Sequence, residues 1–272
     1  MPELPEVETV KNGLIEHCLK SHITNVIIHT EKLRYPLDQL MIQKITTQCI
    51  CNISRRGKHL LIYLDYHALI IHLGMSGTLQ IVDTTNYQLK KHDHIVLNLD
   101  NNQTIFYNDP RRFGYWHITE NDPLLHKCFL NYGPEPLTKN FNTNYLKNSL
   151  NNRSQAIKSV IMNNRVVVGV GNIYACESLF KAGILPLKPA KHLTVSEIKK
   201  LVKTIKLILI KAIARGGTTL KDYKSFKGKP GYFAQSLQVY GQKDKICQIC
   251  KMLIKSIVIN QRNTFYCPRC QK

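Results

Sequence analysis

Four cysteines near the carboxyl end constrain the fold of this chain more than any other feature. They form two C-x-x-C pairs, Cys247 with Cys250 and Cys267 with Cys270, with residues 251–266 between the pairs. This spacing is typical of structural zinc sites, in which two thiolates from each pair complete a tetrahedron with no open position. The intervening segment can pair with itself as a hairpin. We therefore predict a zinc ribbon that holds one Zn²⁺, with disulfides or an iron–sulfur cluster as the alternatives.

The charge balance predicts a polyanionic partner. Lys and Arg number 38 against 18 Asp and Glu, a formal net charge of +20, and the sequence pI is near 9.6. Nucleic acid is the commonest partner of so basic a protein, and its phosphates would make binding sensitive to salt. An anionic membrane surface is the competing explanation, but no basic helix with a broad aromatic or leucine face is evident. No apolar run approaches the length of a membrane span and no secretion signal is recognisable, so we expect a soluble intracellular protein.

The chain has nine cysteines, an odd number. Five of them lie outside the two pairs, at Cys18, Cys49, Cys51, Cys128 and Cys176. Their sequence surroundings are apolar. We expect them to be reduced core residues of a cytosolic protein.

The amino-terminal residues MPELPEVE offer a candidate nucleophile. If Met1 is removed, Pro2 carries a secondary amine that is more often uncharged at neutral pH than a lysine amine. Apolar residues recur at helical spacing from position 4 to position 18, so a helix begins directly after this amine, and its positive end disfavours ammonium. Glu3 would lie beside the amine as a proton donor or acceptor. The alternative is an ordinary capped helix start with solvated acids.

Eight short runs rich in β-branched and aromatic residues follow, with turn residues between them. They cover residues 22–29, 49–54, 59–65, 68–73, 78–82, 94–99, 104–108 and 115–118. Several short strands with frequent turns favour an antiparallel sandwich or barrel. We expect the first helix to pack against it.

The second half of the chain changes character. Residues 131–136, NYGPEP, combine two prolines with a glycine, which ends regular structure and indicates a linker. Helices are expected at 144–150, 154–162, 172–182 and 196–214. Gly, Lys and aromatic residues between 216 and 241 favour a long loop over a ligand site. We divide the chain into domains at 1–130, 131–222 and 223–272.

Two turns carry side chains that could enter DNA. Met75 lies between two glycines in LGMSG, where it is either an apolar wedge that enters a duplex when a base leaves the stack or a core residue of a hairpin turn. In DPRRFG, Arg111 and Phe113 place a cation beside a ring that could stack on bases. The two turns would act together only if they are neighbours, which sequence spacing does not determine.

Further segments suggest phosphate sites. The cluster RRGKH at 55–59 leads into a strand. We expect it to bind phosphate in a general way, and the more specific alternative is a chemical role for Lys58. The residues GVGN, ending at Asn172, join two helices, and exposed amides at such a helix start bind phosphate well, so we infer a DNA-backbone clamp. Arg262 in the ribbon hairpin would bind a phosphate or act as a catalytic cation, although an isolated arginine is more often a surface residue.

Taken in order, eight motifs and the cysteine ribbon resemble those of bacterial formamidopyrimidine-DNA glycosylases. The motifs are PELPEVET (2–9), RRGK (55–58), HLGMSG (72–77), KHDH (91–94), DPRRFG (109–114), VGVGNIYA (168–175), GGTTL (216–220) and GYFA (231–234). The resemblance runs from residue 2 to residue 272 in unchanged order. It implies an α+β fold with an N-terminal helix packed on an antiparallel β-sandwich, then a helical helix-two-turns-helix domain and a C-terminal zinc ribbon.

The resemblance also implies a bifunctional base-excision repair enzyme. It would excise oxidised purines, such as 8-oxoguanine and formamidopyrimidines, from duplex DNA and then cleave the strand as an AP lyase. Pro2 would attack the sugar C1′ to form a Schiff base, and β- and δ-elimination would follow. Glu3 would act as the acid with support from Glu6, and Lys58 and Arg262 would be the assisting cations.

By the same resemblance, contacts with damaged double-stranded DNA involve several segments. The expected DNA-binding residues are His92, Arg111, Arg153, Lys158 and Asn172. The expected intercalating residues are Met75, Arg111 and Phe113. The loop over the lesion would include Thr218, Thr219 and Tyr232. We expect a cytoplasmic monomer, associated with the nucleoid through DNA and with no membrane partner.

Two other interpretations stay open. The related endonuclease VIII branch prefers oxidised pyrimidines and uses the same terminal amine, although by resemblance Leu4 and the intact Met75 and Phe113 turns favour the purine branch. A zinc ribbon, a helix-turn-helix and a charge of +20 would also suit a DNA-binding protein without catalytic activity. In that protein the terminal acids would only start a helix.

Overall fold

The computed structural model describes residues 2–218 and 233–272 of the chain. These residues form two compact units. The first contains residues 2–130 and 216–218, and the second contains residues 131–215 and 233–272. The helical segments and the cysteine-rich end therefore share one unit. The finer boundary expected at residues 222 and 223 lies outside the described residues and stays a prediction.

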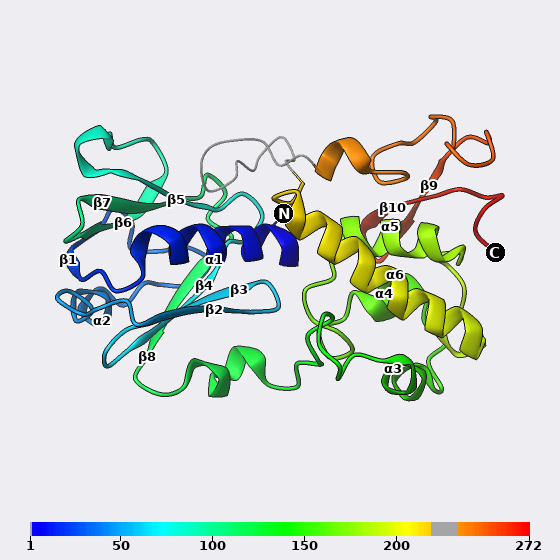
Figure 1. Ribbon diagram of the computed structural model, residues 1–272, viewed down its shortest axis with the longest axis horizontal. Helices are drawn as coiled ribbons and strands as arrows, with labels where there is room; N and C mark the ends of the chain where they lie inside the picture. The colour runs from blue at the N-terminus through cyan, green and yellow to red at the C-terminus, as the bar shows by residue number, and fades with distance from the viewer. Residues whose placement is uncertain (1, 219–232) are drawn as a thin grey trace. The chain divides into compact units, whose positions relative to one another are not determined.

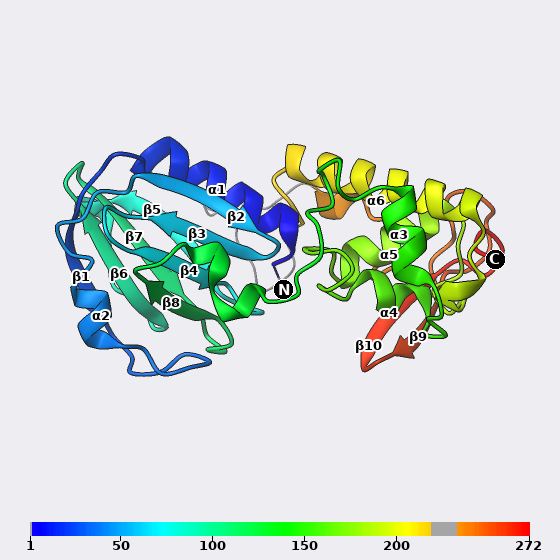
Figure 2. The same cartoon turned by 90° about the horizontal axis from the view of Figure 1, so that it is seen from below.

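The first unit is one helix packed on two antiparallel sheets (Figures 1 and 2). The helix is α1 (Leu4–Cys18), and a short helix α2 (Gln39–Gln43) lies between the first two strands. The strands are β1 (Ile23–Ile28), β2 (Asn52–Arg56), β3 (His59–Tyr63), β4 (Ala68–His72), β5 (Thr78–Asp83), β6 (Asp93–Leu99), β7 (Gln103–Asn108) and β8 (Tyr115–Thr119). Their order is β1-β6-β7-β5 in one sheet and β2-β3-β4-β8 in the other.

A single apolar core holds these layers together. One face of α1 buries Val7, Val10 and Leu14, as the helical spacing requires, and this face joins a cluster with residues such as Leu60 and Ile95 from the two sheets. Figure 2 shows α1 lying along β2. The prediction of a helix on an antiparallel sandwich is confirmed.

The second unit is helical, with a two-stranded hairpin at its carboxyl end. Its elements are α3 (Thr143–Leu150), α4 (Ile157–Ile161), α5 (Asn172–Ala182), α6 (Val195–Ala214), β9 (Lys255–Ile259) and β10 (Arg262–Tyr266). The amphipathic helix α6 buries one stripe that includes Leu201 and Ile205. Its start is fixed by a capping box between Thr194 and Glu197. The described helices are all too short or too polar to cross a lipid bilayer.

Two expectations from the sequence need correction. The helix expected at 154–162 begins only at Ile157, because Ala156 pairs with Pro189 as an isolated β-bridge and the Gln155 carbonyl accepts the Ala190 amide. The strand-like contact holds the residues before Ile157 extended.

The scattered cysteines do not all lie in the core. Cys18 and Cys176 are buried as expected, and all five are free thiols. However, Cys49 and Cys128 are only partly buried, and Cys51 is exposed. Cys49 and Cys51 lie in the segment leading into β2, an edge strand of its sheet, which explains why an apolar sequence context did not mean burial.

Candidate functional site

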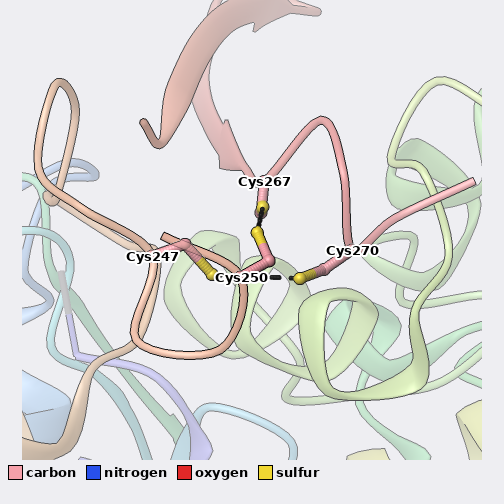
Figure 3. A group of neighbouring side chains, drawn as sticks. All are labelled: Cys247, Cys250, Cys267 and Cys270. Atoms are coloured by element: carbon pink, nitrogen blue, oxygen red, sulfur yellow. Dashed lines mark hydrogen bonds between the residues drawn. The ribbon is translucent and has the colours of Figure 1, made fainter. Parts of the chain in front are cut away.

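The four paired cysteines form one cluster in the second unit. Figure 3 shows their sulfurs pointing toward one another, and all four Sγ atoms lie within 4.8 Å of one another. The Sγ atoms of Cys247 and Cys270 are 3.9 Å apart, and those of Cys250 and Cys267 are 3.3 Å apart. A tetrahedral zinc site with Zn–S bonds of about 2.3 Å requires sulfurs about 3.8 Å apart, so the cluster fits Zn²⁺.

One backbone group near the cluster favours a thiolate ligand, at Cys250. The Met252 amide hydrogen bond lowers the pKa of Cys250 to about 7. The Cys267 amide donates to the Gln271 side chain at 2.9 Å, which fixes the second pair. The hairpin between the pairs closes with a two-residue turn, Asn260-Gln261, where both residues have positive φ, as a tight β-hairpin turn requires. The ribbon therefore presents Arg262, the first residue of β10, as an exposed side chain.

A polar network ties this ribbon to the helices. The Lys158 ammonium donates to Asn172 Oδ1 at 2.5 Å and to Thr264 Oγ1 at 2.6 Å, and the Asn172 amide donates to the Asn263 carbonyl at 2.9 Å. Lys158 is only 1% exposed. By resemblance Lys158 is expected to contact DNA, and in the structure its ammonium holds the Asn172 side chain at the start of α5.

Lys158 and Arg262 line the same concavity. It has a volume of about 160 Å³ and lies between α4 and the tip of the ribbon hairpin, where Asn260 donates to Ser159 at 3.0 Å. Gly171 caps the start of α5 next to this network. Arg153 follows α3, and its guanidinium is held by the Ser149 carbonyl at 2.7 Å. At the concavity, the cations Lys158 and Arg262 lie near the N-terminus of α5, which is a suitable arrangement for backbone phosphates.

The first unit carries the candidate catalytic residues. Pro2, Glu3 and Glu6 are all buried at the start of α1. Glu3 is the N-cap of α1 and forms a reciprocal capping box with Glu6, in which Glu6 Oε2 accepts the Glu3 amide at 2.8 Å. A capped helix start is therefore present, but Glu3 and Glu6 are buried, not solvated as the alternative supposed. The capping box does not account for both carboxylate oxygens of Glu6, because Glu6 Oε1 accepts hydrogen bonds from another segment.

Glu6 Oε1 binds a segment more than two hundred residues away in sequence. It accepts the Thr218 amide at 2.7 Å and the Thr218 hydroxyl at 3.0 Å. Thr218 thus contacts α1, the helix that follows Pro2 in the chain. The expected partners of Thr218 in the lesion loop, Thr219 and Tyr232, lie outside the described residues.

Lys58 lies in the turn between β2 and β3. Gly57 takes a positive φ of 59° there, and the Arg55 guanidinium donates to the Gly57 carbonyl at 2.8 Å. The same guanidinium donates to Glu8 at 2.6 Å, which ties the hairpin to α1. The hairpin that carries Lys58 is therefore anchored to α1, the helix that follows Pro2 in the chain.

The two turns with candidate intercalating residues are neighbours. A Cβ on Gly74 would lie 2.4 Å from the Gly114 amide nitrogen, so only glycine allows this approach. Met75 is 39% exposed and Phe113 is 44% exposed, and the Arg111 guanidinium lies 4.7 Å from the Phe113 ring centroid. Met75 is thus not a core residue, and the three side chains lie on adjacent loops.

Histidines flank these turns. His92 has a left-handed backbone, with φ of 81°, and its carbonyl accepts the Asp109 amide at 3.1 Å. His72 Nδ1 accepts the Gly74 amide at 3.1 Å. Burial, with Lys58 and Arg34, lowers the pKa of His72 to about 4, so the imidazole is neutral and can accept this bond at physiological pH.

Sequence reasoning missed the buried groups that join the two turns, chiefly Asp109, Ser76 and Tyr107. In the sequence, Asp109 is only the first residue of the DPRRFG motif. A carboxylate that follows a strand and precedes Pro110 was the available signal, but its partner in the other turn, Ser76, is 33 residues away, and sequence does not place the two together.

A helix on a sandwich with a buried Pro-Glu start, combined with a helical unit whose zinc ribbon presents cations, defines a DNA glycosylase of the helix-two-turns-helix type. Residues 1–116 match the formamidopyrimidine-DNA glycosylase N-terminal domain, residues 132–224 match the H2TH domain of formamidopyrimidine-DNA glycosylase, and residues 245–272 match the zinc finger found in FPG and IleRS. The chain belongs to the formamidopyrimidine-DNA glycosylase family. The predictions of fold class and of one structural Zn²⁺ are confirmed.

Individual relatives agree along the whole chain. The formamidopyrimidine-DNA glycosylase of Hydrogenovibrio crunogenus is 48% identical, with 100% of this chain and 97% of the relative covered. That of Haemophilus influenzae is 49% identical, with 100% and 99% covered. Among solved structures, the complex between the Lactococcus lactis Fpg and an abasic-site DNA has a TM-score of 0.92 at 34% identity, with 100% of both chains covered.

Proposed function

We propose that this protein excises oxidised purines from duplex DNA with the Pro2 amine as nucleophile, and then cleaves the strand by β,δ-elimination. One observation carries the proposal: Pro2 and Glu3 are buried together at the start of α1, with Glu6 fixed between the Glu3 amide and Thr218. Membership of the glycosylase family and the abasic-site DNA in the Lactococcus lactis complex support it.

In the first step, the Pro2 nitrogen forms a bond to C1′ of the damaged nucleotide. The bond from C1′ to the base breaks, and its electron pair leaves with the base, which takes up the proton that the Pro2 nitrogen releases. As the sugar ring opens, Glu3 protonates the ring oxygen and an iminium forms between Pro2 and C1′. Because Pro2 is a secondary amine, this iminium has no nitrogen proton to lose and stays an electron sink.

The eliminations follow from that electron sink. Loss of a C2′ proton breaks the bond to the 3′ phosphate, and a second elimination breaks the bond to the 5′ phosphate. Lys58 and Arg262 would assist as cations that stabilise the negative charge on the departing phosphates. Water then hydrolyses the iminium and frees Pro2, so the products are a free base, an unsaturated sugar fragment and a one-nucleotide gap flanked by phosphates.

DNA binding would use both units. Arg262, Asn172 and Arg153 in the second unit, and His92 in the first, would contact the backbone, while Lys158 would hold Asn172 in place. Met75, Arg111 and Phe113 would fill the space left by the everted base. Because the proposed substrate is damaged double-stranded DNA, we expect the protein to act in the bacterial cytoplasm, in association with the nucleoid.

Trapping the intermediate tests this proposal. Borohydride added during incubation with a duplex that carries one 8-oxoguanine opposite cytosine should give a covalent complex, and mass spectrometry should find the cross-link on Pro2 with Met1 absent. Pro2→Gly should abolish strand cleavage while duplex binding changes little, whereas Pro5→Ala, in the same stretch, should retain cleavage. An active preparation that keeps Met1 would contradict the mechanism.

The same assay separates the family branches. A parallel duplex with an oxidised pyrimidine should be cleaved more slowly than the 8-oxoguanine duplex. Faster cleavage of the pyrimidine duplex would assign the chain to the endonuclease VIII branch. Binding without cleavage of either duplex would leave only the DNA-binding interpretation.

A further inference from the structure

The carboxylate of Asp109 is the most heavily used buried acceptor near the two exposed turns. Asp109 is 0% exposed. Its Oδ1 accepts the Ser76 hydroxyl at 2.6 Å, and its Oδ2 accepts the Tyr107 hydroxyl at 3.1 Å and the Gly114 amide at 2.8 Å. These donors come from β7 and from both turns. One charged group therefore links segments that are separate in sequence.

Ser76 extends this link across the gap between the turns. Its hydroxyl donates to Asp109 and also accepts the Arg111 amide at 3.3 Å. Met75 precedes Ser76 directly, and Arg111 lies in the exposed part of the second turn. The backbone on which the apolar wedge is mounted is thus bonded to the backbone that carries the arginine.

The packing around this link leaves no free space. A Cβ on Gly77 would lie 2.5 Å from the Tyr107 hydroxyl, and one on Gly114 would lie 1.8 Å from it. The His94 ring binds the Asp109 carbonyl at 2.9 Å, which fixes the Asp109 backbone from a third direction. Because hydrogen bonds to a buried charge are the strong ones, the two turns behave as one rigid piece.

We propose that Asp109 is a positioning residue that locks the Met75 turn and the 110–114 turn into a single wedge. The inference rests on the proposed function, and it adds the residue that makes insertion of Met75, Arg111 and Phe113 concerted. Asp109 itself touches no DNA. Its loss would let the two turns move independently, so that the wedge no longer holds a damaged base out of the stack.

Loss of Asp109 should affect two substrates, 8-oxoguanine and a preformed abasic site, to different extents. Excision of 8-oxoguanine requires a paired base to be displaced, whereas a preformed abasic site has no base to evert. Misplacement of a positioned group by about 1 Å costs on the order of 100-fold in rate. We expect Asp109→Ala to lower single-turnover excision of 8-oxoguanine by about 10- to 100-fold, and to change cleavage at a preformed abasic site by less than about threefold.

Two further variants keep the test decisive. Ser76→Ala leaves the carboxylate in place but removes the hydroxyl that bridges to Arg111. It should therefore also lower the ratio of 8-oxoguanine excision to abasic-site cleavage, by a smaller factor than Asp109→Ala. Asp109→Asn keeps the size of the side chain and one acceptor oxygen. Its ratio of 8-oxoguanine excision to abasic-site cleavage should therefore be close to that of the wild-type protein. If Asp109→Ala does not fold, Ser76→Ala decides the question alone.

The matched control is Glu177→Ala in the second unit. Glu177 is also buried, and its carboxylate accepts the amides of Gln238, Val239 and Tyr240. This variant should lose stability without changing the ratio between the two substrates.

A direct readout of the wedge completes the experiment. 2-Aminopurine placed beside the lesion should brighten when wild-type protein binds and unstacks it, and should brighten less with Asp109→Ala at saturating protein. Equal loss of both activities in Asp109→Ala and Ser76→Ala, with unchanged 2-aminopurine brightening, would overturn the inference. A wild-type protein that cleaves neither substrate would instead overturn the proposed function.

Discussion

The contact between Glu6 and the segment after α6 can be tested with two adjacent glycines. Gly216 and Gly217 both take positive φ, 70° and 80°. A Cβ on Gly216 would meet nothing within 4 Å, whereas a Cβ on Gly217 would lie 2.7 Å from Glu6 Oε1 and 3.1 Å from Glu6 Cδ and Cγ. Gly216→Ala and Gly217→Ala therefore share the same backbone strain, and only the second displaces Glu6.

The expected magnitudes follow from this geometry. Alanine in the left-handed region costs about 1–2 kcal/mol, and both variants should lose that much. In Gly217→Ala the Glu6 carboxylate must also move away from the Glu3 amide or from Thr218, which it binds at 2.7–3.0 Å. Loss of one hydrogen bond to a charged group costs about 1.5–3 kcal/mol, so the total for Gly217→Ala is about 2.5–5 kcal/mol.

Urea unfolding followed by tryptophan fluorescence measures these losses. The chain has one tryptophan, Trp116, which is buried in the core of the first unit, where Glu6 lies. Gly217→Ala should also lower excision of 8-oxoguanine, because Glu6 supports the start of α1, whereas Gly216→Ala should retain it. Equal unfolding free energies and equal activities in the two variants would refute the role given to the Glu6 contact.

Two other predictions concern zinc and pH. Chelation of zinc from the folded protein should remove most DNA affinity in an anisotropy assay, and added Zn²⁺ should restore it, because the ribbon that presents Arg262 is held by the metal; unchanged affinity in metal-free protein would contradict this. The pKa of His72 is lowered from 6.5 to about 4, chiefly by burial, with Lys58 and Arg34 acting in the same direction. The folded state therefore binds fewer protons than the unfolded state, so the stability that neutral His72 contributes is fully present above about pH 6.5 and is lost as the pH falls toward about 4. His72→Asn, whose amide oxygen can still accept the Gly74 amide, should flatten that part of the profile of unfolding free energy against pH; an unchanged slope would show that other groups dominate.

Local chemistry made much of the fold predictable. Short β-branched runs gave all eight strands of the sandwich within a few residues of their observed ends, and α5 was expected at its observed bounds, Asn172–Ala182. The helix at α4 was expected too early, because its first residues pair with Pro189 and Ala190, a contact that periodicity does not contain. The exposed Cys51 shows the same limit, since an apolar neighbourhood in sequence does not say which strand lies at an edge.

The sequence alone determined the features that are set by residue type and short spacing: the zinc ligands, the excess of positive charge, the order of helices and strands, and the nucleophile candidate at Pro2. Zinc coordination and helix or strand periodicity depend on neighbours within a few positions, so they can be read from a linear pattern.

The tertiary structure decided which distant groups meet. It placed Thr218 on Glu6, buried Lys158 against Asn172, and joined the Met75 turn to the 110–114 turn through Asp109. These contacts arise when burial of the apolar core brings segments together that are far apart in sequence, and the buried polar groups must then pair with whichever partners that packing supplies. The sequence shows which residues can donate or accept hydrogen bonds, but only the folded structure determines which donor meets which acceptor.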